Sequence, residues 1–239
     1  MVAIMVARSY SSMAEILRHR CSAKWKLLLD YENNKFIAEM TDDSLPIDKF
    51  IFYLKQDHIF LKEFCSFLAN ARAAEEPSLK RWLGELHYNT VNYEMQMQKK
   101  VLDSLELSGG INIFSSSSTS AAKATLNYIS FLKKVSVSRS VEEMVSAMAP
   151  CPWSYLEIAQ KILMISCSNG QNKIRTEAYQ KWIEFYSSKE SQQQVEYLKS
   201  LLGTLYENAS KSKKLVMEYH FSIACQYEHD FWKMAYNVA

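Results

Sequence analysis

The chain has 239 residues, a formal net charge of +2 and 48% hydrophobic residues. This composition is typical of a globular protein with a sizeable core, and it excludes a disordered tail and a strongly basic nucleic-acid-binding protein. No apolar run approaches the roughly 20 residues of a membrane span, and the apolar stretch at the N-terminus is too short for a secretory signal, so we predict a cytoplasmic protein with no nucleic-acid or membrane partner.

The spacing of apolar residues and the scarcity of glycine and proline both indicate helices. Apolar residues recur at helical spacing throughout, no segment alternates like a strand, and five glycines and four prolines leave little material for hairpin turns. Five widely spaced cysteines without a CxxC motif argue against a disulfide framework or a zinc site, and neither HExxH nor Glu-x-x-His is present. We therefore predict one all-α domain over residues 1–239 that uses no metal and no organic cofactor.

Helix starts and stops divide the first half of the chain into three long segments. A first helix should open at a capping box, Ser12-x-x-Glu15. A second should begin at Pro46 and continue to about Ala73. A third should follow over residues 76–107 and end at the glycine pair 109–110. Its predicted buried face consists of Leu79, Trp82, Leu83, Leu86, Tyr93, Met97 and Val101.

The second half begins with the low-complexity run Ser115–Ser120, which we predict to be a flexible surface loop. Helical periodicity resumes directly after it. Two further capping boxes, Ser140-x-x-Glu143 and Ser187-x-x-Glu190, predict helix starts. The last long helix should cover Ser212–Tyr236.

Three reactive side chains lie on otherwise apolar helix faces. Asp57 falls on the face of the second helix that carries Phe50, Leu54 and Leu61, and Glu228 falls in the middle of the apolar face of the last helix. Cys151 lies on the apolar stripe of the helix that begins at Ser140, between two prolines. Three separate helices should thus direct an aspartate, a cysteine and a glutamate inward.

Each of these side chains has a structural interpretation beside the functional one. A cysteine on an apolar face is commonly a small buried hydrophobe, and a buried carboxylate can belong to an ion pair with lysine or arginine. Taken together, however, a thiol and two carboxylates in one core provide a nucleophile and an acid or base. The inward aromatic residues that would either form flat walls for a planar ring or simply fill the core are Phe60, Tyr128, Tyr155, Tyr186 and Phe231.

Four segments together resemble the signature blocks of the TenA/thiaminase II family, in the same order and over nearly the whole chain. They are LPIDKFIFYLKQDHIFLKEF (Leu45–Phe64), PCPWSYLEIAQ (Pro150–Gln160), YQKWIEFYSSKE (Tyr179–Glu190) and YEHDFWKMAY (Tyr227–Tyr236). The resemblance implies a haem-oxygenase-like helical bundle, assembled as a homotetramer, that hydrolyses aminopyrimidines in thiamin salvage. Members convert 4-amino-5-aminomethyl-2-methylpyrimidine to the hydroxymethyl compound and cleave thiamin itself.

The resemblance also implies roles for individual residues. Cys151 matches the nucleophile, Glu228 the proton donor, and Asp57 the carboxylate that hydrogen-bonds the aminopyrimidine. Tyr155 matches a substrate-binding tyrosine, and Tyr128 and Tyr186 match further pocket tyrosines. We add Phe60 and Phe231 to the predicted substrate-binding residues, because the helical pattern directs both inward. The three groups selected by helical periodicity are thus the three to which the family pattern gives chemistry.

Two features depart from the family pattern. Phe60 stands where a tyrosine commonly assists the cysteine, and a serine-rich segment precedes Tyr128 where proline is usual. Two alternatives to the aminohydrolase therefore stay open. One is a related enzyme that acts on another aminopyrimidine or a formylaminopyrimidine, and the other is a non-catalytic pyrimidine-binding or regulatory protein, which Phe60 favours.

Overall fold

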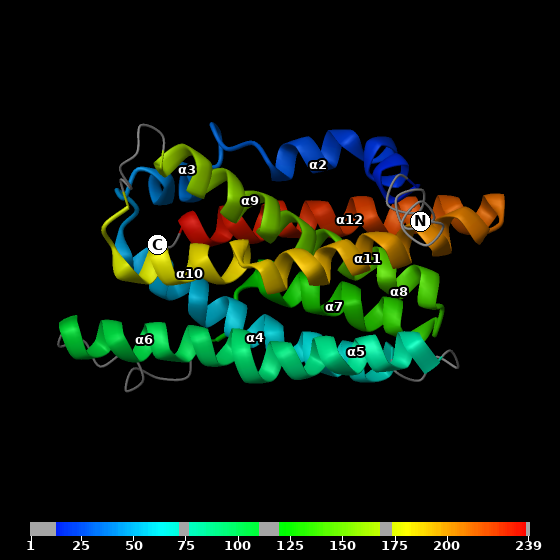
Figure 1. Ribbon diagram of the computed structural model, residues 1–239, viewed down its shortest axis with the longest axis horizontal. Coiled ribbons are helices and arrows are strands. Elements are labelled where there is room, and N and C mark those ends of the chain that lie inside the picture. Colours follow the sequence, from blue (N-terminus) through cyan, green and yellow to red (C-terminus); the bar gives the residue numbers. More distant parts are fainter. Residues whose placement is uncertain (1–12, 72–76, 110–119, 168–173, 238–239) are drawn as a thin grey trace.

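The computed structural model describes residues 13–71, 77–109, 120–167 and 174–237, and within these ranges every regular element is a helix (Figure 1). The prediction of an all-α fold is confirmed. Residues 13–20 are helical; the helices that follow are α2 (Ser22–Leu28), α3 (Lys35–Thr41), α4 (Ile47–Ala71), α5 (Pro77–Asn89), η1 (Thr90–Glu94), α6 (Met95–Gly109), α7 (Lys123–Val137), α8 (Val141–Met148), α9 (Pro150–Ser166), α10 (Glu177–Ser187), α11 (Lys189–Asn208) and α12 (Lys211–Tyr236).

Helix boundaries follow the local signals to within one or two residues, and α4 and α12 each begin one residue from the predicted start. The Ser140 hydroxyl accepts a hydrogen bond from the backbone N–H of Glu143, so the predicted cap of α8 is confirmed. The predicted cap at Ser187 is wrong by one residue, because Ser188 caps α11 and accepts from the N–H of Ser191. Ser187 instead ends α10, and its hydroxyl donates to the carbonyl of Ile183 at 2.6 Å. The predicted cap at Ser12 and the predicted loop at residues 115–119 lie outside the described residues.

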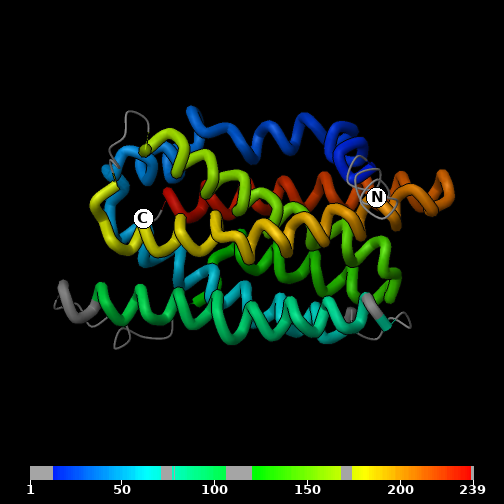
Figure 2. Tube along the Cα trace, in the orientation of Figure 1, coloured from blue at the N-terminus to red at the C-terminus, as the bar shows by residue number. Residues whose placement is uncertain are grey.

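The longest helix, α12, is central to the bundle. It runs along the long axis of the molecule (Figure 2), and it contacts α2, α3, α4, α7, α8 and α9. Its inward face is the predicted one, since Phe221, Ala224, Glu228 and Trp232 are all buried. Because six helices cover α12, a polar group in the middle of that face lies deep in the protein.

A π-helical turn interrupts the third predicted helix. Residues Thr90–Glu94 form η1 between α5 and α6, and the N–H of Met95 bonds to the carbonyl of Thr90, five residues earlier. A π turn holds one residue more than an α turn, so the side chains after it are rotated relative to a continuous α-helix. Tyr93, predicted to be buried, is therefore 57% exposed, while Thr90 and Gln98 are buried.

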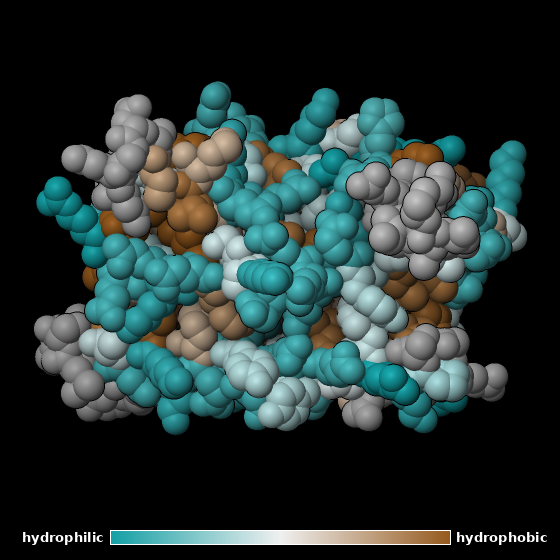
Figure 3. Space-filling view, in the orientation of Figure 1, coloured by the Kyte–Doolittle hydropathy of each residue, from teal (hydrophilic) through white to brown (hydrophobic). Residues whose placement is uncertain are grey.

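The surface is predominantly polar on the face shown in Figure 3, where apolar side chains form separate patches among hydrophilic ones. Over the described ranges, none of the helices combines the length and apolar character needed to cross a bilayer.

Candidate active site

A cavity of about 410 Å³ opens between α4, α5, η1, α9, α10 and α11. Its wall includes three residues predicted for the site, Cys151, Tyr155 and Tyr186, and also Glu94 from η1. The volume falls within the range of roughly 300–1,000 Å³ that is usual for small-molecule sites. The cavity is therefore a suitable place for a small planar ligand beside the Cys151 thiol.

The two prolines around Cys151 set its position. Helix α8 ends at Met148, and α9 begins at Pro150, so Cys151 lies in the first turn of α9, where a missing N–H costs no helical hydrogen bond. The helix predicted from Ser140 is thus divided at Ala149 into α8 and α9. Cys151 is half-buried and keeps accessible surface because it faces the cavity. Its exposure distinguishes it from Cys225, which is completely buried.

Electrostatic coupling joins Cys151 to Glu228. Burial raises the pKa of the Cys151 thiol well above its usual range, and the charges of Glu228, Glu94 and Asp57 raise it further. Burial also raises the pKa of Glu228 to about 7, although hydrogen bonds from Tyr128 and from the Cys151 thiol partly oppose this shift. A thiol donor beside a carboxylate that titrates near neutrality is an arrangement suited to proton transfer.

Aromatic side chains hold Glu228 in place. The Tyr128 hydroxyl donates to Glu228 Oε1 at 2.7 Å. Phe60 packs against the Tyr128 ring with a centroid distance of 4.6 Å, and Phe231 lies 6.2 Å from Phe60. Phe60 thus supports Tyr128 through ring contact. Glu228 is 2% exposed, so its carboxylate and these contacts are shielded from solvent.

Asp57 lies in a second polar group behind the cavity wall. Its Oδ2 accepts from Gln98 Nε2 at 2.6 Å and lies 3.4 Å from the Tyr53 hydroxyl. The Tyr53 hydroxyl in turn lies 3.3 Å from that of Tyr155, which lines the cavity. Burial raises the pKa of Asp57 well above its usual range. A chain of tyrosine hydroxyls therefore connects this carboxylate with the cavity.

None of the three carboxylates Asp57, Glu94 and Glu228 has an ion pair with a lysine or arginine in the described part of the chain. The interpretation of Asp57 and Glu228 as members of structural ion pairs therefore has no support among these residues. Their stabilisation comes from neutral donors, namely amide, hydroxyl and thiol groups. Such donors leave the carboxylates free to change protonation state.

The structure divides the predicted site residues into two groups. Cys151, Tyr155 and Tyr186 line the cavity, whereas the described lining residues do not include Asp57, Phe60, Tyr128, Glu228 and Phe231. Periodicity missed Tyr53 and Gln98, which bond or approach Asp57, because a buried tyrosine or glutamine on a helix face is compatible with ordinary core packing. It also missed Glu94, because no pattern in the sequence revealed the π turn.

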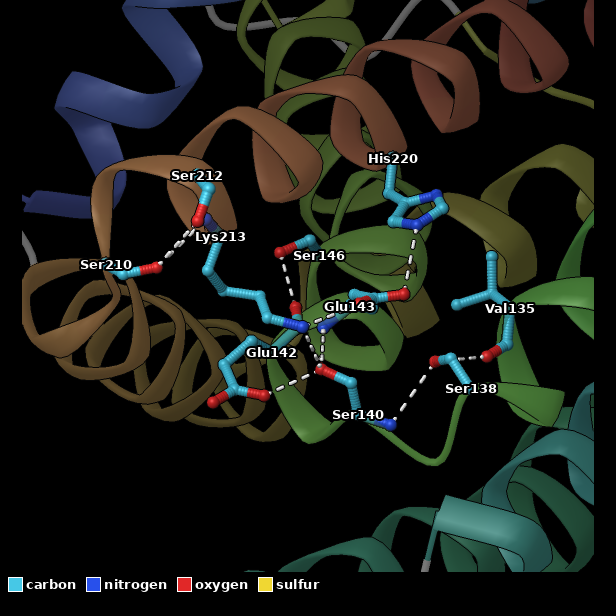
Figure 4. Close-up of polar contacts among 10 residues, drawn as sticks. All are labelled: Val135, Ser138, Ser140, Glu142, Glu143, Ser146, Ser210, Ser212, Lys213 and His220. Atoms are coloured by element: carbon cyan, nitrogen blue, oxygen red, sulfur yellow. Dashed lines mark hydrogen bonds and ion pairs between the residues drawn. The ribbon is translucent and has the colours of Figure 1, made fainter.

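A second polar cluster joins the first turn of α8 to the N-terminal half of α12 (Figure 4). It differs from the candidate site because its carboxylate is paired with basic side chains. Lys213 Nζ lies 2.7 Å from Glu143 Oε1, and His220 Nε2 lies 3.4 Å from Glu143 Oε2. Lys213 also donates to the Ser140 hydroxyl at 3.2 Å. Each charged group here has a partner of opposite sign or a cap residue, which is typical of a contact that ties two helices together.

Comparisons with known proteins identify relatives of the chain by sequence and by fold. The model of the TENA/THI-4/PQQC family matches residues 23–238. A curated relative from Halalkalibacterium halodurans, named aminopyrimidine aminohydrolase, is 28% identical over 206 residues, which are 86% of this chain and 88% of that protein. A solved TenA homologue from P. horikoshii superposes with a TM-score of 0.77 at 24% identity, covering 94% of this chain and 98% of the other. A domain with a heme oxygenase-like fold from Shewanella denitrificans gives a TM-score of 0.70 at 13% identity, covering 92% and 90% of the two chains.

Proposed function

The chain belongs to the TENA/THI-4/PQQC family, and from this membership we propose that it is an aminopyrimidine aminohydrolase of thiamin salvage. The proposed reaction converts 4-amino-5-aminomethyl-2-methylpyrimidine and water to the hydroxymethylpyrimidine and ammonia, and thiamin is a second substrate. The observation that carries the proposal is the accessible Cys151 thiol, which faces a cavity and is coupled electrostatically to the buried carboxylate of Glu228.

The proposed mechanism begins with proton transfer inside this pair. Glu228 takes the thiol proton as the Cys151 sulfur attacks the electron-poor pyrimidine ring and passes it to the ring nitrogen that gains the electron pair, and the ammonium group on the exocyclic methylene then leaves as ammonia. Water adds to the methylene carbon and gives a proton, through Glu228, to the departing ammonia. The proton on the ring nitrogen then returns to the sulfur as the bond between sulfur and ring breaks, which restores the thiol. A pKa of about 7 suits Glu228 to both roles, because it accepts and donates a proton near neutral pH.

We propose that the remaining predicted residues bind and orient the ring. Tyr155 and Tyr186 supply aromatic surface at the cavity wall, and Asp57 hydrogen-bonds the amino-substituted edge of the ring through charge-assisted bonds. The supporting observation for Asp57 is its connection to Tyr155 through the Tyr53 hydroxyl. Tyr128, Phe60 and Phe231 act one step further away, by fixing the Glu228 side chain and its surroundings.

Incubation of the purified protein with the aminomethylpyrimidine, with chromatographic detection of the hydroxymethyl product, tests the proposal. We expect steady turnover by the wild type and a loss of at least about a thousandfold in Cys151→Ala, because the nucleophile is removed. A matched control is Cys225→Ala, which removes a completely buried thiol on α12. Absence of turnover in the wild type, or unchanged turnover in Cys151→Ala, would contradict the proposed function.

We also propose an oligomeric state and a cellular location for the protein. The family resemblance supports a homotetramer, which light scattering at several protein concentrations tests. All five cysteines are unpaired, and this supports a reducing compartment such as the cytoplasm. Fractionation of cells that express the full chain tests the location.

A further inference from the structure

Glu94 is a carboxylate in the cavity that the mechanism above does not use. It is the last residue of η1, the π-helical turn, and it is half-buried, with accessible surface on the cavity side. Asp57 and Glu228, by comparison, are 4% and 2% exposed. Glu94 is thus the carboxylate, among these three, that a molecule inside the cavity reaches directly.

Tyr186 fixes the orientation of Glu94. Its hydroxyl donates to Glu94 Oε1 at 2.7 Å, and its ring lies at the same cavity wall. A carboxylate accepts about four hydrogen bonds through its two oxygens, so the single bond from Tyr186 leaves most of this capacity for a ligand. Glu94 is therefore held in position without being saturated.

The charge of the cavity wall has one sign. Among the described residues that line it, Glu94 and Glu190 are acidic, and none is a lysine, arginine or histidine. Charges interact more strongly in such a partly dry space than in water, so a cation inside the cavity would be favoured and an anion disfavoured. Asp57 and Glu228, which lie deeper, add to the same field.

Resting on the proposed function, we propose that Glu94 binds the positive charge of the leaving group on the exocyclic methylene and makes the enzyme select pyrimidines with cationic leaving groups. The aminomethyl group is an ammonium ion near neutral pH, and the thiazolium of thiamin is a permanent cation. A formylamino group is neutral. Glu94 is thus a specificity-determining residue, distinct from Glu228, which exchanges the proton with Cys151.

The electrostatics of Glu94 are consistent with this role. Burial raises its pKa to about 7, while the hydrogen bond from Tyr186 lowers it. The ionisable groups coupled to it through space or by hydrogen bond are Asp57, Cys65, Cys151, Tyr53 and Tyr186. All of them are acidic, so the positive charge that would stabilise ionised Glu94 has to arrive with the ligand.

Binding measurements on Cys151→Ala, which blocks turnover, test this assignment. Isothermal titration would compare the cationic aminomethylpyrimidine with the neutral hydroxymethylpyrimidine, with and without the second change Glu94→Gln. We expect Glu94→Gln to weaken binding of the aminomethyl compound about tenfold or more, the range for a hydrogen bond to a charged group, and to change binding of the hydroxymethyl compound less than about threefold. Equal weakening of both compounds would overturn the assignment.

Two further variants separate charge from folding. Glu94→Asp keeps the carboxylate, and we expect it to retain preference for the cation over the neutral compound. If Glu94→Gln does not fold, loss of this preference in Glu94→Asp, measured the same way, would count against the assignment. Glu184→Gln, an exposed change on the same helix as Tyr186, should leave both affinities unchanged. Wild-type protein without turnover would contradict the proposed function only, because the binding comparison would still report on Glu94.

Discussion

Two glutamates on helices that pack together, Glu143 on α8 and Glu228 on α12, have opposite electrostatic surroundings. Burial alone would raise the pKa of Glu143, but the hydrogen bond from Lys213 and the charges of Lys213 and His220 bring it below its usual value (Figure 4). Burial raises the pKa of Glu228 to about 7, because only a phenol and a thiol bond to it. A paired carboxylate stays ionised, whereas an unpaired one can exchange protons.

This difference separates residues that hold the fold together from residues that carry chemistry. The Glu143 cluster connects α8 to the start of α12 by paired charges. Asp57, Glu94 and Glu228 instead concentrate acidic groups around Cys151 without a compensating base in the described part of the chain. Such an arrangement costs stability when the groups ionise, so we expect it to persist because the reaction needs it.

Removal of the Glu228 carboxylate should give the largest effect. We expect Glu228→Gln to lower kcat/KM for the aminomethylpyrimidine by about a hundredfold or more, because Cys151 then loses its proton acceptor and the pyrimidine ring its proton donor. Glu143→Gln, the matched change in the paired cluster, should leave kcat/KM within about twofold. Comparable activities of the two variants would remove the functional distinction between the two glutamates.

Tyr128→Phe should give an intermediate effect that depends on pH. The Tyr128 hydroxyl donates to Glu228 and lowers its pKa, so its removal raises this pKa and reduces the ionised fraction at pH 7. We expect kcat/KM to fall about tenfold at pH 7, as for loss of a hydrogen bond to a charged group, and to recover at higher pH. A pH–rate profile with an unchanged midpoint would show that Tyr128 does not act through Glu228.

Glu143→Gln should produce a small loss of stability at pH 7. The Glu143 side chain is 15% exposed and the Lys213 side chain 33%, so solvent screens their ion pair, and we expect a loss of about 1 kcal/mol or less in the free energy of unfolding by urea. Lys213→Met removes the partner charge and should cost a similar amount. A gain of stability in either variant would contradict a structural role for the cluster.

Phe60→Tyr should have the smallest effect on turnover among the changes at predicted site residues. Phe60 is 2% exposed and packs on Tyr128, and Cys151 is already coupled to Glu228 without a hydroxyl at position 60. We expect kcat/KM to change less than about threefold, while a buried hydroxyl without a partner would cost about 1–3 kcal/mol of stability. A tenfold gain in kcat/KM would show that the wild-type thiol is incompletely activated.

The parts of the site that lie on regular helix faces are predictable from the sequence. Asp57, Cys151 and Glu228 each interrupt an apolar stripe, and all three stripes are buried as expected. Helical periodicity identifies such positions because burial of a charged or reactive group is unusual. The all-α fold is equally predictable, since the sequence shows no strand alternation and contains few glycines and prolines.

The rest of the site depends on geometry that no local pattern encodes. Tyr93 is exposed and Glu94 lines the cavity because η1 adds one residue to a turn, and nothing in its sequence marks the π turn. Gln98 becomes a partner of Asp57 only through packing of α6 against α4. Contacts between residues far apart in the chain determine both positions.

Stability of Glu228→Gln as a function of pH tests the central claim most directly, namely that Glu228 is a buried carboxylate kept without a cation. Its pKa rises from 4.5 to about 7 on folding, so the folded state binds more protons between these values, and wild-type stability should fall as pH rises through this window. The glutamine variant carries no charge, and urea unfolding should show it more stable than the wild type by up to about 3 kcal/mol at pH 8 and no more stable at pH 4. A Glu228→Gln variant less stable than the wild type at pH 8 would contradict the account.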